Sequence, residues 1–385
     1  MYMVEFITNV NSAVNGFVWG VPMLVLLVGT GILMTILTKF FQLSHLGHWF
    51  KNTVGGIFHD EHVTKHTEAG DQSISQFQSL CTALAATIGT GNIVGVASAL
   101  VAGGPGAIFW MWVVAFFGMM TNYSENVLGI YYRRRNSRGE WSGGAMYYLK
   151  DGLGSYKGCK QIGAVLAVLF SAFCLLASFG IGNMSQVNSI AANMTSAFSI
   201  PATVTGIVLV IIGALVIVGG LKRIAAVTEK LVPFMAIAYV IGALVIFFAN
   251  IGHVGAVFTA IFKGAFGLRA VGGGIVGSGV KLALTWGMKR GVFSNEAGLG
   301  SSVMVHSSSN VKEPVRQGMW GIFEVFADTM VVCTLTAFAV LSSGLIDLDT
   351  GAVLVDVSGS ALVGQAFATV FGSFGPAFIA IAILL

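Results

Sequence analysis

The fold is decided by nine residues, Ala85-Ala86-Thr87-Ile88-Gly89-Thr90-Gly91-Asn92-Ile93, which interrupt an apolar stretch covering residues 77–102. Each glycine inside a helix costs about 1 kcal/mol relative to alanine. Unwinding the helix here would free backbone amide and carbonyl groups, which lipid cannot satisfy. The sequence therefore predicts a helix that breaks at mid-membrane depth, where its free backbone groups face a cavity with a bound ion or ligand.

The composition around this stretch is that of a membrane protein. Only 9% of the 385 residues are charged, 55% are hydrophobic, and the mean hydropathy is +0.84. No charged residue occurs over residues 72–124 or over residues 161–221. A bilayer solvates such runs, whereas water does not. The net charge of +4 reflects basic loops and does not indicate a nucleic-acid partner.

Nine segments are long and apolar enough to cross a bilayer, which requires about 20 residues each. We expect a leader span followed by eight core spans, at residues 17–38, 77–102, 106–131, 162–192, 203–220, 231–250, 276–306, 317–343 and 360–385. Lys and Arg concentrate in alternate connections: residues 132–161 hold seven and residues 344–358 none. Basic loops favour the cytoplasm, so the first core span should start from the cytoplasmic side.

The sixth core span carries a second interruption, Gly291-Val292-Phe293-Ser294-Asn295-Glu296-Ala297-Gly298-Leu299-Gly300. Broken helices in corresponding positions of two halves are typical of secondary transporters, whose ligand sites lie between the breaks. The two interruptions are five spans apart, and this odd offset places the halves in opposite membrane orientations. Small residues can also serve helix packing alone. A dinucleotide-binding loop would need a βαβ unit, for which there is no pattern.

Four further polar residues lie within apolar spans and are candidates for function. Gln186 and Asn183, in the third span, can contact a small substrate or another helix. Glu324 and Asp328, four residues apart on the seventh span, can pair with Lys281, Lys289 or Arg290, or line an ion path. Glu125, near the basic run at residues 133–135, is expected to form a structural ion pair.

Several motifs resemble the alanine or glycine:cation symporter family. They are Ile74-Ser75-x-Phe77-Gln78, Gly89-Thr90-Gly91-Asn92-Ile93, Gly103-Gly104-Pro105-Gly106-Ala107-Ile108-Phe109-Trp110-Met111-Trp112 and Phe293-Ser294-Asn295-Glu296-Ala297-Gly298. The resemblance implies an all-α, LeuT-type fold of two inverted five-helix repeats with discontinuous core helices one and six. Residues 1–76 would form the leader span and a cytoplasmic loop, residues 77–250 the first repeat, and residues 251–385 an incomplete second repeat. Because the family carries two further spans, we expect the chain to be truncated at its C-terminus.

The resemblance also implies a set of site residues. By similarity, the backbone amides of Thr90, Gly91 and Asn92 would bind a substrate carboxylate. Phe293, Ser294 and Asn295 would line the pocket from the sixth core span, and Gln186 from the third. Ala85 and Ile88 would offer carbonyl oxygens to one sodium ion, and Thr87 and Asn92 would serve a second.

The function implied is sodium-coupled uptake of small neutral amino acids, alanine and glycine, by a multi-pass protein of the plasma membrane. Sodium would be co-transported, and the lipid bilayer would be the other partner. The main alternative is a proton-coupled carrier of amino acids or other small solutes, in which Glu296 would titrate. A channel would need a ring-forming filter. An enzyme would need a catalytic cluster, and the spans contain no such pattern, so we expect a transporter.

Overall fold

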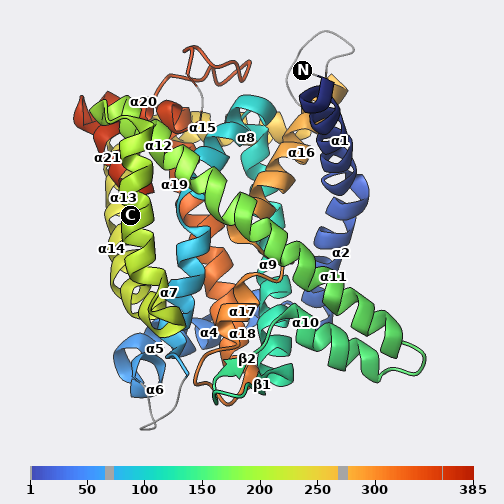
Figure 1. Cartoon of the computed structure of the whole chain (residues 1–385). Helices are drawn as coiled ribbons and strands as arrows, with labels where there is room; N and C mark the ends of the chain where they lie inside the picture. Colours follow the sequence, from blue (N-terminus) through green and yellow to red (C-terminus); the bar gives the residue numbers. More distant parts are fainter. Residues whose placement is uncertain (1, 66–72, 268–275, 358) are drawn as a thin grey trace.

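The computed structural model describes residues 2–65, 73–267, 276–357 and 359–385. Within these ranges the chain is a bundle of helices, with one short antiparallel ribbon of β1 and β2 (Figure 1). The elements in chain order are α1 (Tyr2–Val18), α2 (Val21–Leu37), α3 (Phe41–Ser44), α4 (Leu46–Asn52), α5 (Val54–His59), α6 (Glu61–Thr64), α7 (Gln76–Thr87), α8 (Val96–Gly103), α9 (Gly106–Tyr132), β1 (Arg134–Arg135), β2 (Trp141–Ser142), α10 (Ala145–Tyr147), α11 (Lys160–Phe179), α12 (Ser185–Phe198), α13 (Ala202–Ile217), α14 (Gly220–Ala249), α15 (Val254–Phe266), α16 (Val276–Asn295), α17 (Ser302–His306), α18 (Pro314–Val325), α19 (Thr334–Ser342), α20 (Ser360–Phe371) and α21 (Phe374–Leu384).

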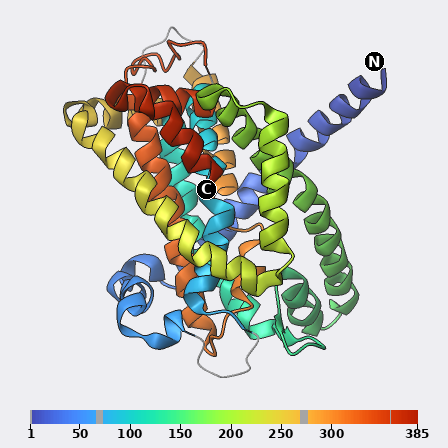
Figure 2. The same cartoon turned by 60° about the vertical axis from the view of Figure 1, so that its left-hand side comes forward.

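The described helices confirm an all-α polytopic membrane protein. Five of them are long and apolar enough to cross a membrane, and the bent pair formed by Gln76–Thr87 and Gly91–Gly103 brings the number to six. Helix α9 lies at the centre and packs against α2, α15, α16 and α18. Helices α11 and α12 cross the bundle obliquely, and α13 packs against both α12 and α14 (Figures 1 and 2).

The first core span is broken where the sequence predicts. Helix α7 begins with a capping box, in which the Ser75 hydroxyl accepts from the Gln78 amide and the Gln78 side chain accepts from the Ser75 amide. It ends at Thr87, and Gly89 follows with φ of 157°. The chain resumes as a π-helical turn, Gly91–Gly95, which continues into α8 at an angle of 44° to α7.

The second break occupies only part of the predicted interruption. Helix α16 continues through Phe293 and ends at Asn295, and the irregular backbone covers residues 296–301. There Glu296 and Gly298 have φ of 54° and 89°. A residue with a side chain rarely takes this left-handed conformation, so Glu296 marks the point at which α16 stops. The predicted discontinuity of both core spans is therefore confirmed, with the second one shifted toward α17.

Glycines let two helices pack closely against α9. A Cβ atom at Gly287 of α16 would lie 2.3 Å from the carbonyl oxygen of Ala107 in α9. A Cβ atom at Gly106 of α9 would lie 2.3 Å from the backbone of Gly264 in α15. Only glycine permits these approaches, which bring α15 and the second broken span directly against α9.

Several predicted span limits are wrong. The expected loop at residues 221–230 is the first third of α14, because its charged residues are good helix formers and no glycine interrupts them. The expected span at residues 360–385 is two short helices, α20 and α21, separated at Gly372 with φ of 59°. The leader span, expected at residues 17–38, belongs to a longer helical segment. This segment begins at Tyr2, and only a short break near Gly20 separates α1 from α2.

The basic and non-basic connections lie at opposite ends of the bundle. The ribbon β1–β2 is at one end, and the connection between α19 and α20 is at the other (Figure 1). We therefore expect, in a background without the four native cysteines, that Thr350→Cys reacts with an impermeant thiol reagent added outside cells and Ser137→Cys does not. Permeabilised cells provide the control, since both positions are exposed and both should then react. Labelling of residue 137 in intact cells would contradict this orientation.

Candidate functional site

A cavity of about 150 Å³ lies between the two broken spans. It is enclosed by the end of α7, the π-helical turn after the first break, the last turn of α16 with the start of the second break, and the third span. The residues that line it are Ala85, Ala86, Thr87, Gly91, Gly182, Gln186, Phe293 and Glu296. Its volume is below the roughly 300 Å³ at which pockets for drug-sized ligands begin, so it suits a small solute.

Five residues predicted for the site line this cavity: Ala85, Thr87, Gly91, Gln186 and Phe293. Three further residues line the cavity but were not predicted to do so. Ala86 and Glu296 are adjacent to predicted residues, and either could have been included on position alone. Gly182 stands in a π-helical turn, Gly180–Met184, which is not visible in the sequence pattern.

Thr90 and Gln186 link the first break to the third span. The Thr90 hydroxyl donates to the Oε1 atom of Gln186, and Thr90 is buried. Gln186 belongs to α12, so this hydrogen bond joins segments that are almost 100 residues apart in the sequence. It closes one side of the cavity, and it places the predicted contact of the third span directly against the predicted contact of the first.

Asn92, Ser294 and Asp328 form a buried polar cluster beside the cavity. The Asn92 Nδ2 atom donates to the Asp328 Oδ1 atom at 2.6 Å and to the Ser294 hydroxyl at 3.2 Å. The Ser294 hydroxyl donates to the Asp328 Oδ2 atom at 2.8 Å. The Asn92 side-chain oxygen accepts from the Gly89 amide at 2.8 Å. All three side chains are fully buried, so both broken spans meet α18–α19 at one carboxylate.

Two more residues extend this cluster away from the cavity. The Thr329 hydroxyl donates to the Asp328 Oδ2 atom at 2.7 Å. The Asn295 Nδ2 atom contacts the Thr329 hydroxyl at 3.2 Å, and its Oδ1 atom accepts from the Ala297 amide. Ser294 and Asn295, both predicted for the pocket wall, therefore lie with this cluster and are not among the residues that line the cavity.

The possible ion pairs of the seventh span with basic residues of α16 are not formed. Asp328 has the partners just given, and Glu324 contacts His306 and Asn122. Arg290 instead packs its guanidinium over the rings of Trp286 and Phe293, with centroid distances of 5.3 and 5.6 Å. Because Phe293 lines the cavity, Arg290 supports one of its walls.

The predicted ion pair of Glu125 is also wrong. Its Oε2 atom accepts from the Gly298 amide at 3.1 Å. Arg133 donates to the backbone carbonyls of Ser307 and Ser309, at 3.0 and 2.6 Å. The Glu125 carboxylate thus accepts a hydrogen bond from a backbone amide that has no helical partner at the second break. The spacing of charges along the sequence could not indicate this contact.

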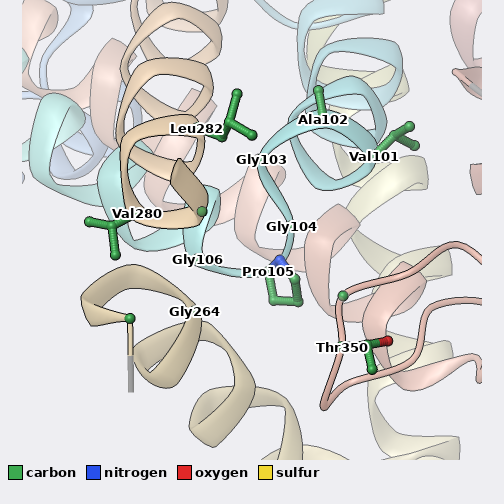
Figure 3. A pocket seen from close by; sticks show the side chains of 13 residues that line it. Val101, Ala102, Gly103, Gly104, Pro105, Gly106, Gly264, Val280, Leu282 and Thr350 are labelled. Atoms are coloured by element: carbon green, nitrogen blue, oxygen red, sulfur yellow. The ribbon is translucent and has the colours of Figure 1, made fainter. Parts of the chain in front are cut away.

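A second hollow, of about 270 Å³, lies where α8, α15 and α16 meet the connection between α19 and α20 (Figure 3). Its described wall is mostly glycine and aliphatic side chains, with Thr350 as the polar side chain. The described part of this wall offers no charged side chain to recognise a zwitterionic solute. The cavity between the breaks, with Gln186, Glu296 and helix ends around it, is therefore the candidate site.

Comparison with known proteins agrees with this architecture. The profile of the Sodium:alanine symporter family matches residues 4–385. The sodium/alanine symporter AgcS of Methanococcus maripaludis is 46% identical over 364 residues, which are 94% of this chain and 76% of that protein. An uncharacterized transporter of Haemophilus influenzae is 44% identical, over 88% of this chain and 70% of that protein. The putative sodium/proton-dependent alanine carrier protein YrbD of Bacillus subtilis is 37% identical, over 99% of this chain and 74% of that protein.

These matches cover nearly the whole chain at identities well above 30%, and its helices provide at least five candidate membrane spans. The family consists of transporters and not enzymes. The chain belongs to the Sodium:alanine symporter family and is a multi-pass protein of the plasma membrane.

Proposed function

We propose that this protein carries alanine and glycine into the cell together with sodium, by alternating access. The observation that carries the proposal is the Asp328 cluster beside the cavity. Asp328 is fully buried, and no Lys or Arg among the described residues pairs with it. A buried carboxylate is stable only when a cation or a proton accompanies it. A sodium ion at this cluster would supply that charge and tie ion binding to the substrate cavity.

The substrate carboxylate would bind at the first break. The segment Gly91–Gly103 begins a new helical stretch at the cavity wall, and helix N-termini carry free amides and a partial positive charge. The amides of Thr90, Gly91 and Asn92 would face the carboxylate, as in transporters with broken helices. Gln186 would bind the substrate from the opposite wall.

Sodium would bind at the other side of the same break. Helix α7 ends at Thr87, so the carbonyl groups of its last three residues lack intrahelical partners. Oxygen atoms are the ligands that hard cations prefer. The carbonyls of Ala85 and Ile88 would hold one sodium ion, and the side chains of Thr87 and Asn92 would serve a second, whose charge the Asp328 carboxylate beside Asn92 would neutralise.

The small cavity should restrict the substrate to small side chains, and Phe293 is its largest wall residue. Phe293→Ala should therefore allow leucine and methionine to compete with labelled alanine, which they should not do in the wild-type protein. Phe248→Ala removes a lipid-exposed ring of α14 and serves as the matched control. If leucine competition does not rise in Phe293→Ala, then Phe293 does not limit substrate size.

We further propose that the core follows the LeuT-type arrangement, with residues 77–250 as one repeat and residues 251–385 as part of an inverted second repeat. The support is the pair of breaks, one in each half, that meet at one cavity. In this arrangement the two halves move relative to each other around the cavity, which opens it alternately to either side of the membrane.

Proton coupling is the second candidate function. Glu296 lines the cavity, and Asp328 lies beside it, so either carboxylate could take up a proton in place of sodium. The two candidates differ in what drives uptake. Purified protein in liposomes should accumulate labelled alanine with an inward sodium gradient at equal pH. Accumulation with a proton gradient alone, and none with sodium, would overturn sodium coupling.

A further inference from the structure

A second polar cluster is buried on the side of the breaks that carries the basic ribbon. It consists of Ser79 of α7, Asn122 of α9, His306 of α17, and Gln317 and Glu324 of α18. All five side chains are buried, and none of them lines the cavity between the breaks. The cluster therefore connects α7 and α17, the half-helices that flank the two breaks on this side, to the central helix α9.

His306 is the centre of the cluster. Its Nε2 atom lies 3.1 Å from the Glu324 Oε2 atom, which also accepts from Asn122 at 3.0 Å. Its Nδ1 atom lies 2.5 Å from the Gln317 Nε2 atom and 3.3 Å from the Ser79 hydroxyl. In the arrangement with Gln317 donating, Nδ1 is the acceptor, and an Nε2–H group would donate to the carboxylate.

Two polar groups beside this pair have no hydrogen-bond partner among the described residues. They are the second carboxylate oxygen of Glu324 and the side-chain amide of Asn126, and both residues are fully buried. Asn126 is one turn from Asn122 on the same face of α9, and it packs against Gly321 of α18. Unpaired buried groups are costly, and one of them belongs to the carboxylate that contacts His306.

The surroundings of the pair are acidic. Glu324 interacts electrostatically with Glu125 of α9, Glu296 of the second break and Asp328 after α18. Arg133, after α9, is directed at backbone carbonyls of the connection between α17 and α18. His306 is the base in direct contact with one of these carboxyl groups.

The Gln317 amide can pair with His306 before and after proton uptake. The Ser309 hydroxyl donates to the Gln317 Oε1 atom at 3.1 Å, while the Gln317 Nε2 atom faces His306. If the Gln317 amide turns over, Oε1 accepts from a protonated Nδ1, and Nε2 faces the Ser309 oxygen. A side-chain amide carries both a donor and an acceptor, so Gln317 can contact Nδ1 in both protonation states.

We propose that His306, Glu324 and Gln317 form a proton-binding site, separate from the transport cavity, which locks α17 to α7 and α18 when the proton is bound. Protonation turns the neutral His306–Glu324 contact into an ion pair, which is stronger in a buried setting. The proton belongs to the pair as a unit. One end of α7 and one end of α17 lie next to the two breaks, so both short helices can change their angle there. The protonated pair would hold them in place and keep the cavity closed on the side of the basic loops.

We expect that a lower pH on the cytoplasmic side of the protein slows sodium-driven alanine uptake. This rests on the proposed function, since uptake is the readout. Sodium-driven alanine uptake into liposomes should fall several-fold as the internal pH is lowered from about 8 to about 5.5, the range over which histidine ordinarily titrates, with the external pH held constant. His306→Gln should remove most of this dependence. His253→Gln, which changes an exposed histidine after α14, should retain it.

A second measurement does not need transport. The melting temperature of the purified wild-type protein, without sodium or alanine, should exceed that of His306→Gln, and this difference should increase as the pH is lowered. In proteins that carry Glu324→Gln, the difference should no longer increase. A wild-type protein without any sodium-driven uptake would contradict the proposed function, while the melting series would still test the proton site. The proton site itself is overturned if His306→Gln keeps the wild-type pH profile of uptake, or if the melting difference is independent of pH.

Discussion

Asp328→Asn should lower the apparent sodium affinity by about 100-fold or more and nearly abolish sodium-driven alanine uptake at low sodium. The substitution keeps the size of the side chain and removes its charge. Removing one partner of a buried charge pair costs about 3–5 kcal/mol, and each 1.4 kcal/mol corresponds to a tenfold change in affinity. Sodium titration of uptake in liposomes measures the effect.

The control for this prediction is Asp356→Asn, which removes the same charge from an exposed position in the connection between α19 and α20. Its sodium dependence should match that of the wild type. Since Asp328 also accepts hydrogen bonds from Asn92, Ser294 and Thr329, folding of the variant must be checked by its elution as a single species. A folded Asp328→Asn protein with wild-type sodium dependence would show that this carboxylate does not neutralise the ion.

Asn92→Ala should weaken sodium binding and, at limiting sodium, alanine binding. The Asn92 side chain donates to Asp328 and accepts from the Gly89 amide, so it holds the break and the carboxylate together. Its backbone amide remains available to the substrate in the variant. Loss of a buried hydrogen-bonding group of this kind costs about 1–3 kcal/mol, equivalent to roughly a 5- to 150-fold weaker interaction with sodium. Alanine binding measured at a series of sodium concentrations gives both affinities.

Asn92 could instead serve only to join the helices. In that case alanine binding at saturating sodium would fall, while the sodium concentration for half-saturation would stay unchanged. Ser98→Ala provides the comparison, because Ser98 lies in the following helix α8 and its hydroxyl donates locally, to the carbonyl of Val94 in the preceding π-helical turn. An unchanged half-saturation in Asn92→Ala would contradict a role in coupling.

The two breaks were predictable because they depend on local chemistry. Gly89 adopts a backbone conformation that favours glycine, and the sequence contains polar residues where a helix in lipid would otherwise be continuous. The second break was placed too early because α16 tolerates Gly291 inside it, where the helix is in van der Waals contact with Met111 and Val114 of α9. Tertiary contact, which a single sequence does not show, overrode the low helix propensity of that glycine.

The partners of the buried carboxylates were not predictable. Charge spacing suggested basic residues of α16 for Asp328 and Glu324, yet Asp328 binds amide and hydroxyl groups and Glu324 binds His306 and Asn122. Asn92 and Asp328, for example, are more than 200 positions apart in the sequence. Only the packing of the two breaks against α9 and α18 brings such residues together.

The central claim is that sodium and substrate occupy adjacent positions at the first break and stabilise each other. Equilibrium binding of labelled alanine to the purified protein, at constant pH and a series of sodium concentrations, tests it most directly. Linkage requires that sodium raises alanine affinity by the same factor by which alanine raises sodium affinity. We expect alanine affinity to rise with sodium until it saturates, and potassium at equal ionic strength to have no such effect. An alanine affinity that is independent of sodium would contradict the account.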